Sequence, residues 1–420
     1  MPKDSVSVPL PNSAAQPGRL KVPLSQPLRH VRYRRLWIAN LVSNLGTWIQ
    51  TFVSAWLIAS MSHSASTTSL VQTASYVPIF LFALIAGVVA DAVDRPKFLF
   101  CCNLFMAACA CTLAALVLTG HIAAAPVLAL TFCLGAGSAF MWPAWQASMS
   151  SLVDPAELEA AATLNNLSYN VAAVVGPALG GVLFSWIGPG ALFLANALSF
   201  IGLLTVYWSW WREREAVAIS PAPFLESLKA GLRCALGCSR YRSILVNVCT
   251  VFFATIAFAS LLPVFVRDVL HMNSSVFGTL MGSLGCGAVL AAFVLPSLRC
   301  RYDRKRLLSC ALVVYGLMLL AMSCVRSLPV LMSLIVCGGM AWSATVSTLN
   351  AAAQASFPPH IRARTLSIYL FVMAGGYTVG SLVWGRVADR FGVQAAFALA
   401  GACVLVNALV LASARREKPL

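Results

Sequence analysis

Charged side chains in the stretch "GVVADAVDRPK", residues 87–97, are the first in this sequence whose spacing suggests a chemical role. Asp91 closes a run of apolar residues, and the pair Asp94 and Arg95 follows it. A carboxylate in that place can accept hydrogen bonds from the free N–H groups at the start of another helix, where the helix dipole favours negative charge. Such a contact would bias a change of shape rather than catalyse a reaction.

Arg95 has candidate partners in the stretch "DPAELE", residues 154–159. Three acids there could pair with it: Asp154, Glu157 and Glu159. Contacts of this kind would form only when one side of the molecule is closed, so we predict a gate. Ordinary charge at a membrane edge, with no gating role, is the alternative.

Other site chemistries find no support in the residues. No nucleophile–base arrangement favours an enzyme, and no G-x-x-x-x-G-K-[ST] segment supports direct use of ATP. Most of the fourteen cysteines lie in apolar runs, and no histidine cluster accompanies Cys234 and Cys238. We therefore expect no metal and no cofactor.

Twelve apolar segments must position these residues. Of the 420 residues, 60% are hydrophobic and 10% are charged, whereas a soluble chain carries roughly 25% charged residues. Each run is long enough to cross a bilayer core of about 30 Å. The sequence predicts an all-α polytopic membrane protein with spans at 36–60, 69–90, 98–119, 123–150, 161–185, 189–210, 243–266, 276–298, 307–325, 328–350, 364–385 and 393–413.

The distribution of the net charge of +16 sets the predicted topology. With the N-terminus inside, all but four of the 29 Lys and Arg fall on the inner side; the exceptions are Arg267, Arg326, Arg386 and Arg390. This asymmetry is typical of proteins that obey the positive-inside rule, and it predicts that both termini are cytoplasmic. The basic excess thus indicates topology and affinity for the lipid bilayer, not nucleic-acid binding.

The chain divides into two similar halves. Residues 1–35 form a predicted cytoplasmic tail, 36–210 a six-helix bundle, 211–242 a linker, 243–413 a second six-helix bundle and 414–420 a second cytoplasmic tail. The linker segment "PAPFLESLKAGLRCAL" has apolar residues at helical spacing, which predicts an amphipathic helix on the membrane surface; a solvated linker is the alternative. Asp94 and Arg95 recur as Asp303 and Arg304 at an offset of 209.

Polar and aromatic residues recur within several spans. Amides with aromatic planes suit a bulky, hydrogen-bonding small molecule, although hydrogen bonding between helices and, for Trp, anchoring at the membrane surface are alternatives. The candidate cavity residues are Asn40, Asn44, Trp48, Trp142, Trp145, Gln146, Asn166, Asn170, Asn247, Trp342 and Asn350.

None of the thirteen Asp and Glu falls in the middle of a predicted span. The residues themselves therefore suggest no proton carrier inside the membrane. Asp389 lies past the end of the eleventh predicted span, where pairing with Arg386 or Arg390 is its simplest role.

The stretch "GPALGG" places Gly176, Pro177, Gly180 and Gly181 inside one span. Glycines on one strip let another helix approach closely, and the proline can bend the helix. Gly176 and Gly181 recur as Gly380 and Gly385 at an offset of 204.

These motifs resemble those of the major facilitator superfamily, in its branch of secretion-type permeases similar to the enterobactin exporter. Gly87, Asp91 and Arg95 match the loop motif G-x-L-a-D-r-x-G-r-k, and "GPALGG" matches the core of an antiporter motif, with Ala172 where a further glycine is usual. The resemblance runs from about residue 28 to the last span. It implies two pseudo-symmetric six-helix bundles, a substrate site between them, a partner for Asp91 at the start of the eleventh span, and exchange with protons.

The predicted function is export of a small organic molecule, foremost a siderophore of catecholate or hydroxamate type, by a monomer in the cell inner membrane. A multidrug or macrolide efflux pump is the first alternative, and a siderophore importer is the second. If "GPALGG" is a plain packing contact, it carries no information on direction. A non-transporting membrane scaffold or sensor is disfavoured by the polar residues within the spans and by the gate motif.

Overall fold

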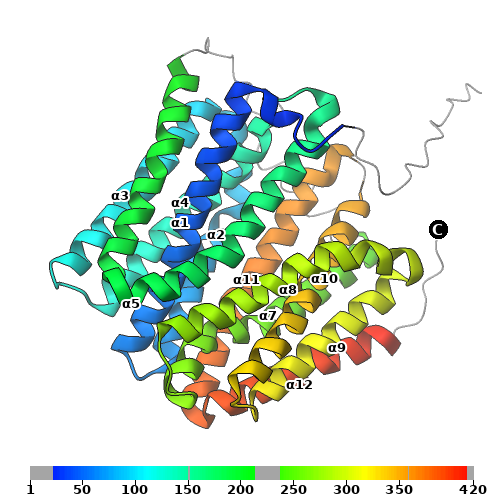
Figure 1. The fold of residues 1–420 in the computed structure, drawn as a ribbon. Coiled ribbons are helices and arrows are strands. Elements are labelled where there is room, and N and C mark those ends of the chain that lie inside the picture. The colour runs from blue at the N-terminus through cyan, green and yellow to red at the C-terminus, as the bar shows by residue number, and fades with distance from the viewer. Residues whose placement is uncertain (1–21, 150–151, 213–236, 358, 414–420) are drawn as a thin grey trace, which may run out of the picture.

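The structure, a computed structural model, describes residues 22–149, 152–212, 237–357 and 359–413. Within these ranges the chain forms eleven long α-helices and no strand (Figure 1). Short helical turns η1 (Pro27–Arg29), η2 (Pro155–Glu157) and η3 (Phe265–Val269) lie between or before them. The long helices are α1 (Val31–Met61), α2 (Ala65–Ala92), α3 (Arg95–Leu118), α4 (Ala124–Met149), α5 (Leu158–Arg212), α7 (Ser239–Val264), α8 (Ser274–Arg301), α9 (Arg304–Met322), α10 (Leu328–Ala355), α11 (Pro359–Phe391) and α12 (Val393–Ser413).

Helix α5 accounts for two of the predicted spans. Its 55 residues are interrupted at Gly188, whose φ of 77° and ψ of 168° are not helical. Glycine adopts a positive φ without steric cost, and Pro189 is suited to the first position of the helix that resumes. The described residues therefore contain eleven helices where twelve spans were predicted, and one of the eleven is divided at Gly188.

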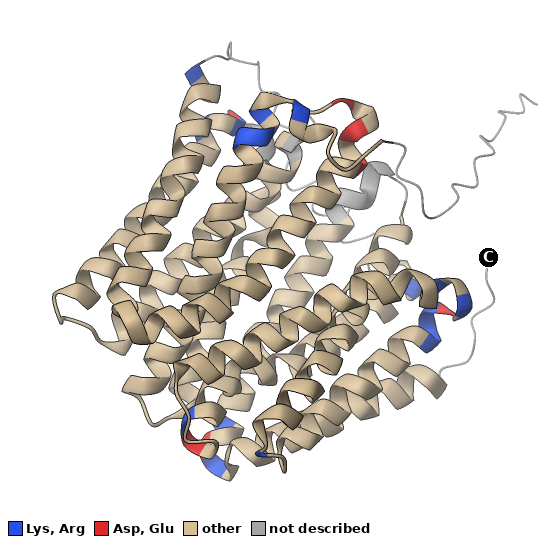
Figure 2. Ribbon diagram, viewed as in Figure 1, with Lys and Arg blue, Asp and Glu red and all other residues tan. Residues whose placement is uncertain are grey.

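Within the described ranges, ten helices are long and apolar enough to cross a membrane, which confirms an all-α, multi-pass membrane protein. Helix α1 is not among the ten, and the polar stripe that includes Asn40, Asn44 and Thr47 explains why. Figure 2 shows the positions of Lys, Arg, Asp and Glu gathered at the helix ends, with almost none along the helix middles. With no water in a bilayer core, a helix satisfies its own backbone hydrogen bonds.

The helices form two bundles, α1 to α5 and α7 to α12. The bundles contact each other mainly through α2 with α11 and through α5 with α8. We call the helix ends that carry Arg32, Lys97 and Arg306 the basic face, and the ends that carry Arg267 and Asp389 the far face. Figure 1 shows the bundles meeting toward the far face and diverging toward the basic face.

Several helices extend beyond the predicted spans. Helix α11 continues to Phe391, six residues past the predicted end, and α1 begins at Val31, five residues before the predicted start. Hydropathy detects the part of a helix that lies in lipid, but a helix can continue into water. The predicted amphipathic segment lies in residues 213–236, which are outside the described residues together with 1–21 and 414–420.

Candidate functional site

A carboxylate of one bundle caps a helix of the other bundle at the far face. Asp389, near the end of α11, accepts hydrogen bonds from the backbone N–H groups of Ala65 at 2.6 Å and Ser66 at 3.2 Å. It also accepts one from the Ser64 hydroxyl at 2.9 Å. The first N–H groups of a helix have no partner within that helix, and the dipole favours negative charge there. The two bundles are thus joined by a charge-assisted contact.

The same two helices meet below this cap, and we call the whole region the α2–α11 contact. Thr73 and Ser381 hydroxyls lie 2.6 Å apart and are buried. Each hydroxyl also donates within its own helix, Thr73 to the Ser69 carbonyl at 3.4 Å and Ser381 to the Thr378 carbonyl at 3.0 Å. Deeper still, the rings of Tyr76 and Tyr377 lie 4.3 Å apart between centroids. Polar bonds at the far face therefore give way to ring packing toward the middle.

A second joint, the α5–α8 contact, brings backbones together directly. A methyl group added at Gly181 would lie 2.8 Å from the Ser274 carbonyl oxygen and 2.9 Å from the Gly278 Cα. One added at Gly278 would lie 2.7 Å from the Pro177 carbonyl oxygen. The Ser274 hydroxyl donates to the Gly181 carbonyl at 3.2 Å and lies 3.0 Å from the Ser185 hydroxyl. Only glycine fits at this approach.

The glycines of "GPALGG" pack against different neighbours. A methyl group at Gly176 would lie 2.6 Å from Cβ of Trp48, and one at Gly180 would lie 2.9 Å from the Phe52 ring; both neighbours belong to α1 of the same bundle. Gly181 alone of these three faces the other bundle. The motif thus combines packing within one bundle with a contact between bundles.

Aromatic rings of both bundles gather at mid-height of the helices. In the second bundle, Trp342 of α10 lies 5.4 Å from Phe252 and 6.5 Å from Tyr377, measured between ring centroids. In the first bundle, Trp48 of α1 packs edge-on to Tyr169 of α5 at 5.7 Å. The sequence predicted Trp48 and Trp342 here but not the tyrosines. The only feature of the sequence that could have indicated these tyrosines is a ring with a hydroxyl group inside an otherwise apolar run.

The predicted amides and the remaining tryptophans are spread over different surroundings. Trp142 is 43% exposed, whereas Trp145 is 6% exposed and packs with Leu36 and Tyr207 inside the first bundle. The structure therefore places Trp145 in a core rather than on a surface between the bundles. Asn247 and Asn350 are half-buried and take part in hydrogen bonds within their own helices. Asn40 and Asn44 are half-buried, while Gln146, Asn166 and Asn170 are exposed.

At the basic face, the structure describes some of the predicted gate residues. The Asp94 side chain accepts from the Lys97 N–H at 3.1 Å and so caps α3. A methyl group at Gly87 would meet no atom within 4 Å. Asp303 and Arg304 begin α9 in the second bundle. The side chain of Asp91 and its predicted partner at the start of α11 lie outside the described part of the chain, so that latch stays a prediction.

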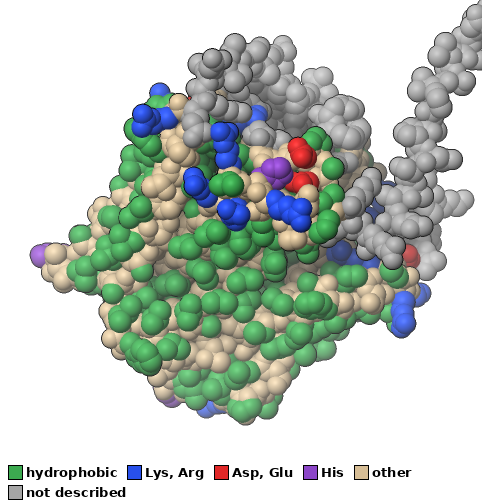
Figure 3. Space-filling view, turned by 45° about the horizontal axis from the view of Figure 1, so that its top comes forward, with side chains coloured by type: hydrophobic (Ala, Val, Ile, Leu, Met, Phe, Trp, Pro, Cys, Tyr) green, Lys and Arg blue, Asp and Glu red, His purple; other side chains and the backbone are tan. Residues whose placement is uncertain are grey.

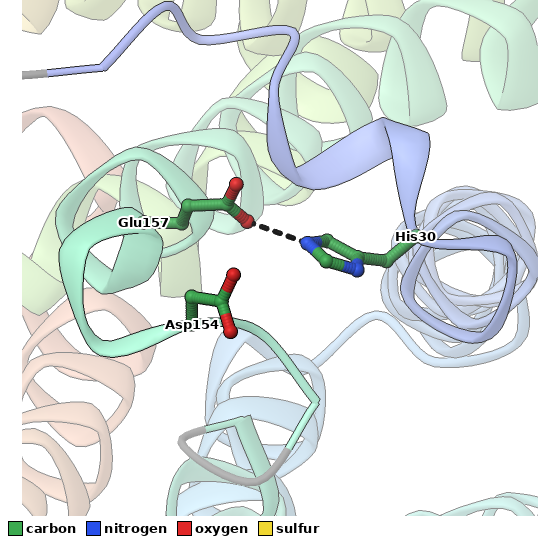
Figure 4. Close-up of side chains that lie close together, drawn as sticks. All are labelled: His30, Asp154 and Glu157. Carbon is green, nitrogen blue, oxygen red and sulfur yellow. Dashed lines mark hydrogen bonds and ion pairs between the residues drawn. The ribbon is translucent and has the colours of Figure 1, made fainter.

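Glu157 has a partner that the sequence did not suggest. It is 5% exposed and accepts a hydrogen bond from Nε2 of His30 at 2.8 Å, which ties the start of α1 to η2 (Figure 4). Asp154 completes a group whose possible ligand atoms lie within 4.8 Å of one another. Arg29 and Arg32 flank His30 in the chain. Figure 3 shows basic side chains around this group, and their charge disfavours a bound cation.

Comparison with known proteins decides the family. A family model described as transmembrane secretion effector matches residues 23–418. The chain belongs to the transmembrane secretion effector family of major facilitator transporters. It is therefore a multi-pass transporter of small molecules and not an enzyme.

The relatives of this transporter include proteins that are named for different cargoes. The chain is 23% identical over 388 residues to the staphyloferrin A transporter of Staphylococcus aureus, covering 90% of this chain and 94% of that one. It is 23% identical over 371 residues to the multidrug efflux pump Tap of Mycolicibacterium fortuitum, covering 86% and 90%. A bacterial homologue of the lysosomal transporter Spinster shares the fold with a TM-score of 0.70 at 16% identity, covering 92% and 95% of the two chains.

Proposed function

We propose that this transporter exports a small organic molecule from the cytoplasm by alternating access, with the basic face in the cytoplasm of the cell that carries it. The main support for this proposal is that hydrogen bonds join the two bundles at the far face, whereas the bundles diverge toward the basic face. An exporter loads its cargo from the cytoplasmic side, which in this proposal is the side toward which the bundles diverge. Both termini are then cytoplasmic, the membrane is the inner membrane, and the working unit is a monomer.

A siderophore is the substrate that we propose first. One relative is named for staphyloferrin A, which supports siderophore transport in this branch. The residues that we propose to contact the substrate offer indole, phenol and amide groups: Asn44, Trp48, Tyr169, Trp342 and Tyr377. Planar rings stack on such side chains, and amides and phenols hydrogen-bond to oxygen-rich ligands.

A multidrug efflux pump is the second candidate, because another relative is named as one. Both candidates share export, for which the resemblance of "GPALGG" to the antiporter motif is the residue-level support. The second alternative, a siderophore importer, would use the same surfaces in the reverse direction. Proton exchange is proposed for the exporter from its family resemblance, since no acidic residue falls in the middle of a predicted span to suggest a carrier.

The experiment compares a deletion strain with its parent in iron-poor medium and on drug plates. Siderophore export predicts that the deletion strain loses siderophore from the culture supernatant, measured by mass spectrometry, and keeps it inside the cells. Drug sensitivity with normal siderophore secretion would instead support the efflux pump. Loss of siderophore uptake with normal secretion would support the importer.

Complementation by two tryptophan variants tests the proposed site. Trp342→Ala removes a ring that contacts Phe252 and Tyr377, so we expect it to restore less than about a tenth of the secretion. Trp186→Ala is the matched control, because Trp186 is 79% exposed near the far end of the first segment of α5. Equal rescue by both variants, at equal protein levels, would contradict the proposed site.

Vesicles with the membrane everted test the coupling. With the cytoplasmic side outward, an imposed pH gradient, acidic inside, should drive substrate into the lumen. Substrate uptake that ignores the gradient would refute proton exchange while leaving export intact.

A further inference from the structure

We propose that Asp389 is a releasable latch of the far face, a residue that positions the two bundles and must leave the start of α2 each time that face opens. The inference rests on the proposed alternating access. It goes beyond it by assigning to one carboxylate the release of the α2–α11 contact at the far face.

The geometry is that of a cap supplied from another bundle. Asp389 accepts hydrogen bonds from the Ser64 hydroxyl and from the backbone N–H groups of Ala65 and Ser66. Ser64 is itself the residue before α2, and its hydroxyl accepts from the Thr67 N–H at 3.2 Å. Three consecutive residues of one bundle therefore depend on a single side chain of the other.

The position of Asp389 suits release. Its bonds to Ser64 and Ser66 lie at the protein surface, so water can replace each of them when the helices part. A bond exchanged for water changes the free energy by only about 1 kcal/mol, and somewhat more when one partner is charged. A latch of this strength holds the face closed yet does not lock it. The neighbouring Arg267 adds a bond from its guanidinium to the Ser62 carbonyl, at the end of α1.

The sequence around Asp389 repeats the sequence around the predicted basic-face latch. "GVVAD" ends at Asp91, just before the end of α2 at Ala92, and "GRVAD" ends at Asp389, just before the end of α11 at Phe391. Helices α2 and α11 are antiparallel in this contact, since α2 begins at the far face and α11 ends there. Each helix thus carries nearly the same five-residue pattern near its end, and at the far face that pattern lies beside the start of α2. One carboxylate at each end would close the face that the other opens.

The test measures how often the α2–α11 contact opens, in purified full-length protein in detergent. The reporter is Ala388→Cys, a buried position on the same stripe of α11 as Ser381 and Gly385. The rate of labelling by a maleimide is followed by peptide mass spectrometry, which separates this position from the fourteen native cysteines.

Asp389→Asn should raise the labelling rate about tenfold, the effect of losing a charged acceptor of several bonds. Arg390→Gln is the matched control, since Arg390 is the next residue and lies over the Phe391 ring rather than on α2. An unchanged rate in Asp389→Asn, or an equal rise in Arg390→Gln, would overturn the proposal. Size-exclusion profile and thermal unfolding show whether each variant is folded.

Ser64→Ala keeps the latch testable if Asp389→Asn fails to fold. This variant removes one of the three donors to Asp389, and we expect a rise of about threefold. A folded Ser64→Ala protein that labels at the parental rate would also overturn the proposal. Labelling needs no substrate, so its outcome is separate from the secretion assay. The secretion assay can contradict the proposed function while the labelling assay supports the latch, and the reverse can also occur.

Discussion

The α2–α11 contact and the α5–α8 contact join the same two bundles with different chemistry. In the first, side chains bridge the helices through a carboxylate, a hydroxyl pair and stacked rings. In the second, Gly181 and Gly278 let the backbones touch, and serine hydroxyls donate to a carbonyl.

The difference indicates a division of roles. Side-chain bonds at an exposed end can be lost one at a time to water, so the α2–α11 contact can be adjusted in small steps. A backbone approach has no adjustable part, because any added atom pushes the helices apart. We therefore expect the α5–α8 contact to respond to size and the α2–α11 contact to respond to charge and hydrogen bonding.

The largest effect should come from Gly278→Ala. The new methyl group would meet the Pro177 carbonyl at 2.7 Å, and overpacking of this kind costs about 1 to 3 kcal/mol. Far-face closure should weaken, and secretion by the proposed exporter should fall by more than about tenfold. Gly282→Ala is the control one turn along α8, where the methyl group would lie 3.4 Å from Ala178 Cβ, an ordinary contact. Equal secretion from both variants would contradict the role of size.

The next largest effect is expected at the basic-face end of α2, opposite the end where Asp389 lies. Asp91→Asn should weaken closure of the basic face and so slow labelling of the cysteine at position 388, by about three- to tenfold. Its sign is opposite to that of Asp389→Asn. Labelling of the double variant should return toward the parental rate. A faster rate in Asp91→Asn would show that the two carboxylates do not oppose each other.

A smaller effect is expected from the buried hydroxyl pair. Thr73→Val keeps the shape and removes the hydroxyl that pairs with Ser381, which leaves Ser381 bonded to the Thr378 carbonyl. Loss of one neutral hydrogen bond should favour the open far face by about 1 kcal/mol, or about fivefold in labelling rate. Ser381→Ala and the double variant complete a mutant cycle. Additive effects would show that the two hydroxyls act independently.

The smallest effect should come from Ser185→Ala. Its hydroxyl lies 3.0 Å from that of Ser274, but Ser185 is exposed and water can take its place. We expect a change of about 0.5 kcal/mol or less, which is less than about threefold in labelling rate. An effect as large as that of Gly278→Ala would mean that hydroxyls, and not glycines, hold the α5–α8 contact.

The membrane fold was predictable because apolar runs of about twenty residues rarely occur in soluble proteins. The sequence also singled out "GPALGG", since three glycines and a proline inside a span demand a packing reason. Which glycine faces which helix was not predictable, because Gly180 and Gly181 differ by one residue and face Phe52 and Gly278 respectively. That choice depends on how the two bundles are placed.

The role of Asp389 escaped prediction for a physical reason. The predicted span ends at residue 385, which puts Asp389 in a loop beside Arg386 and Arg390. The helix instead continues to Phe391 and carries the carboxylate to the start of α2. Likewise, the rings of Tyr76 and Tyr377 meet although 300 residues of chain separate them, and no local periodicity encodes such a pair.

Gly188 has a mechanical consequence for this transporter. A single residue joins the segments 158–187 and 189–212, where a flexible loop would normally absorb relative motion. Any tilt of the first segment against α8 is therefore passed directly to the second, which packs against α1 and α3 of its own bundle. The two segments of α5 then move together as one rigid unit with the first bundle. A side chain at Gly188 would disturb this rigid connection, because its φ of 77° excludes most residues.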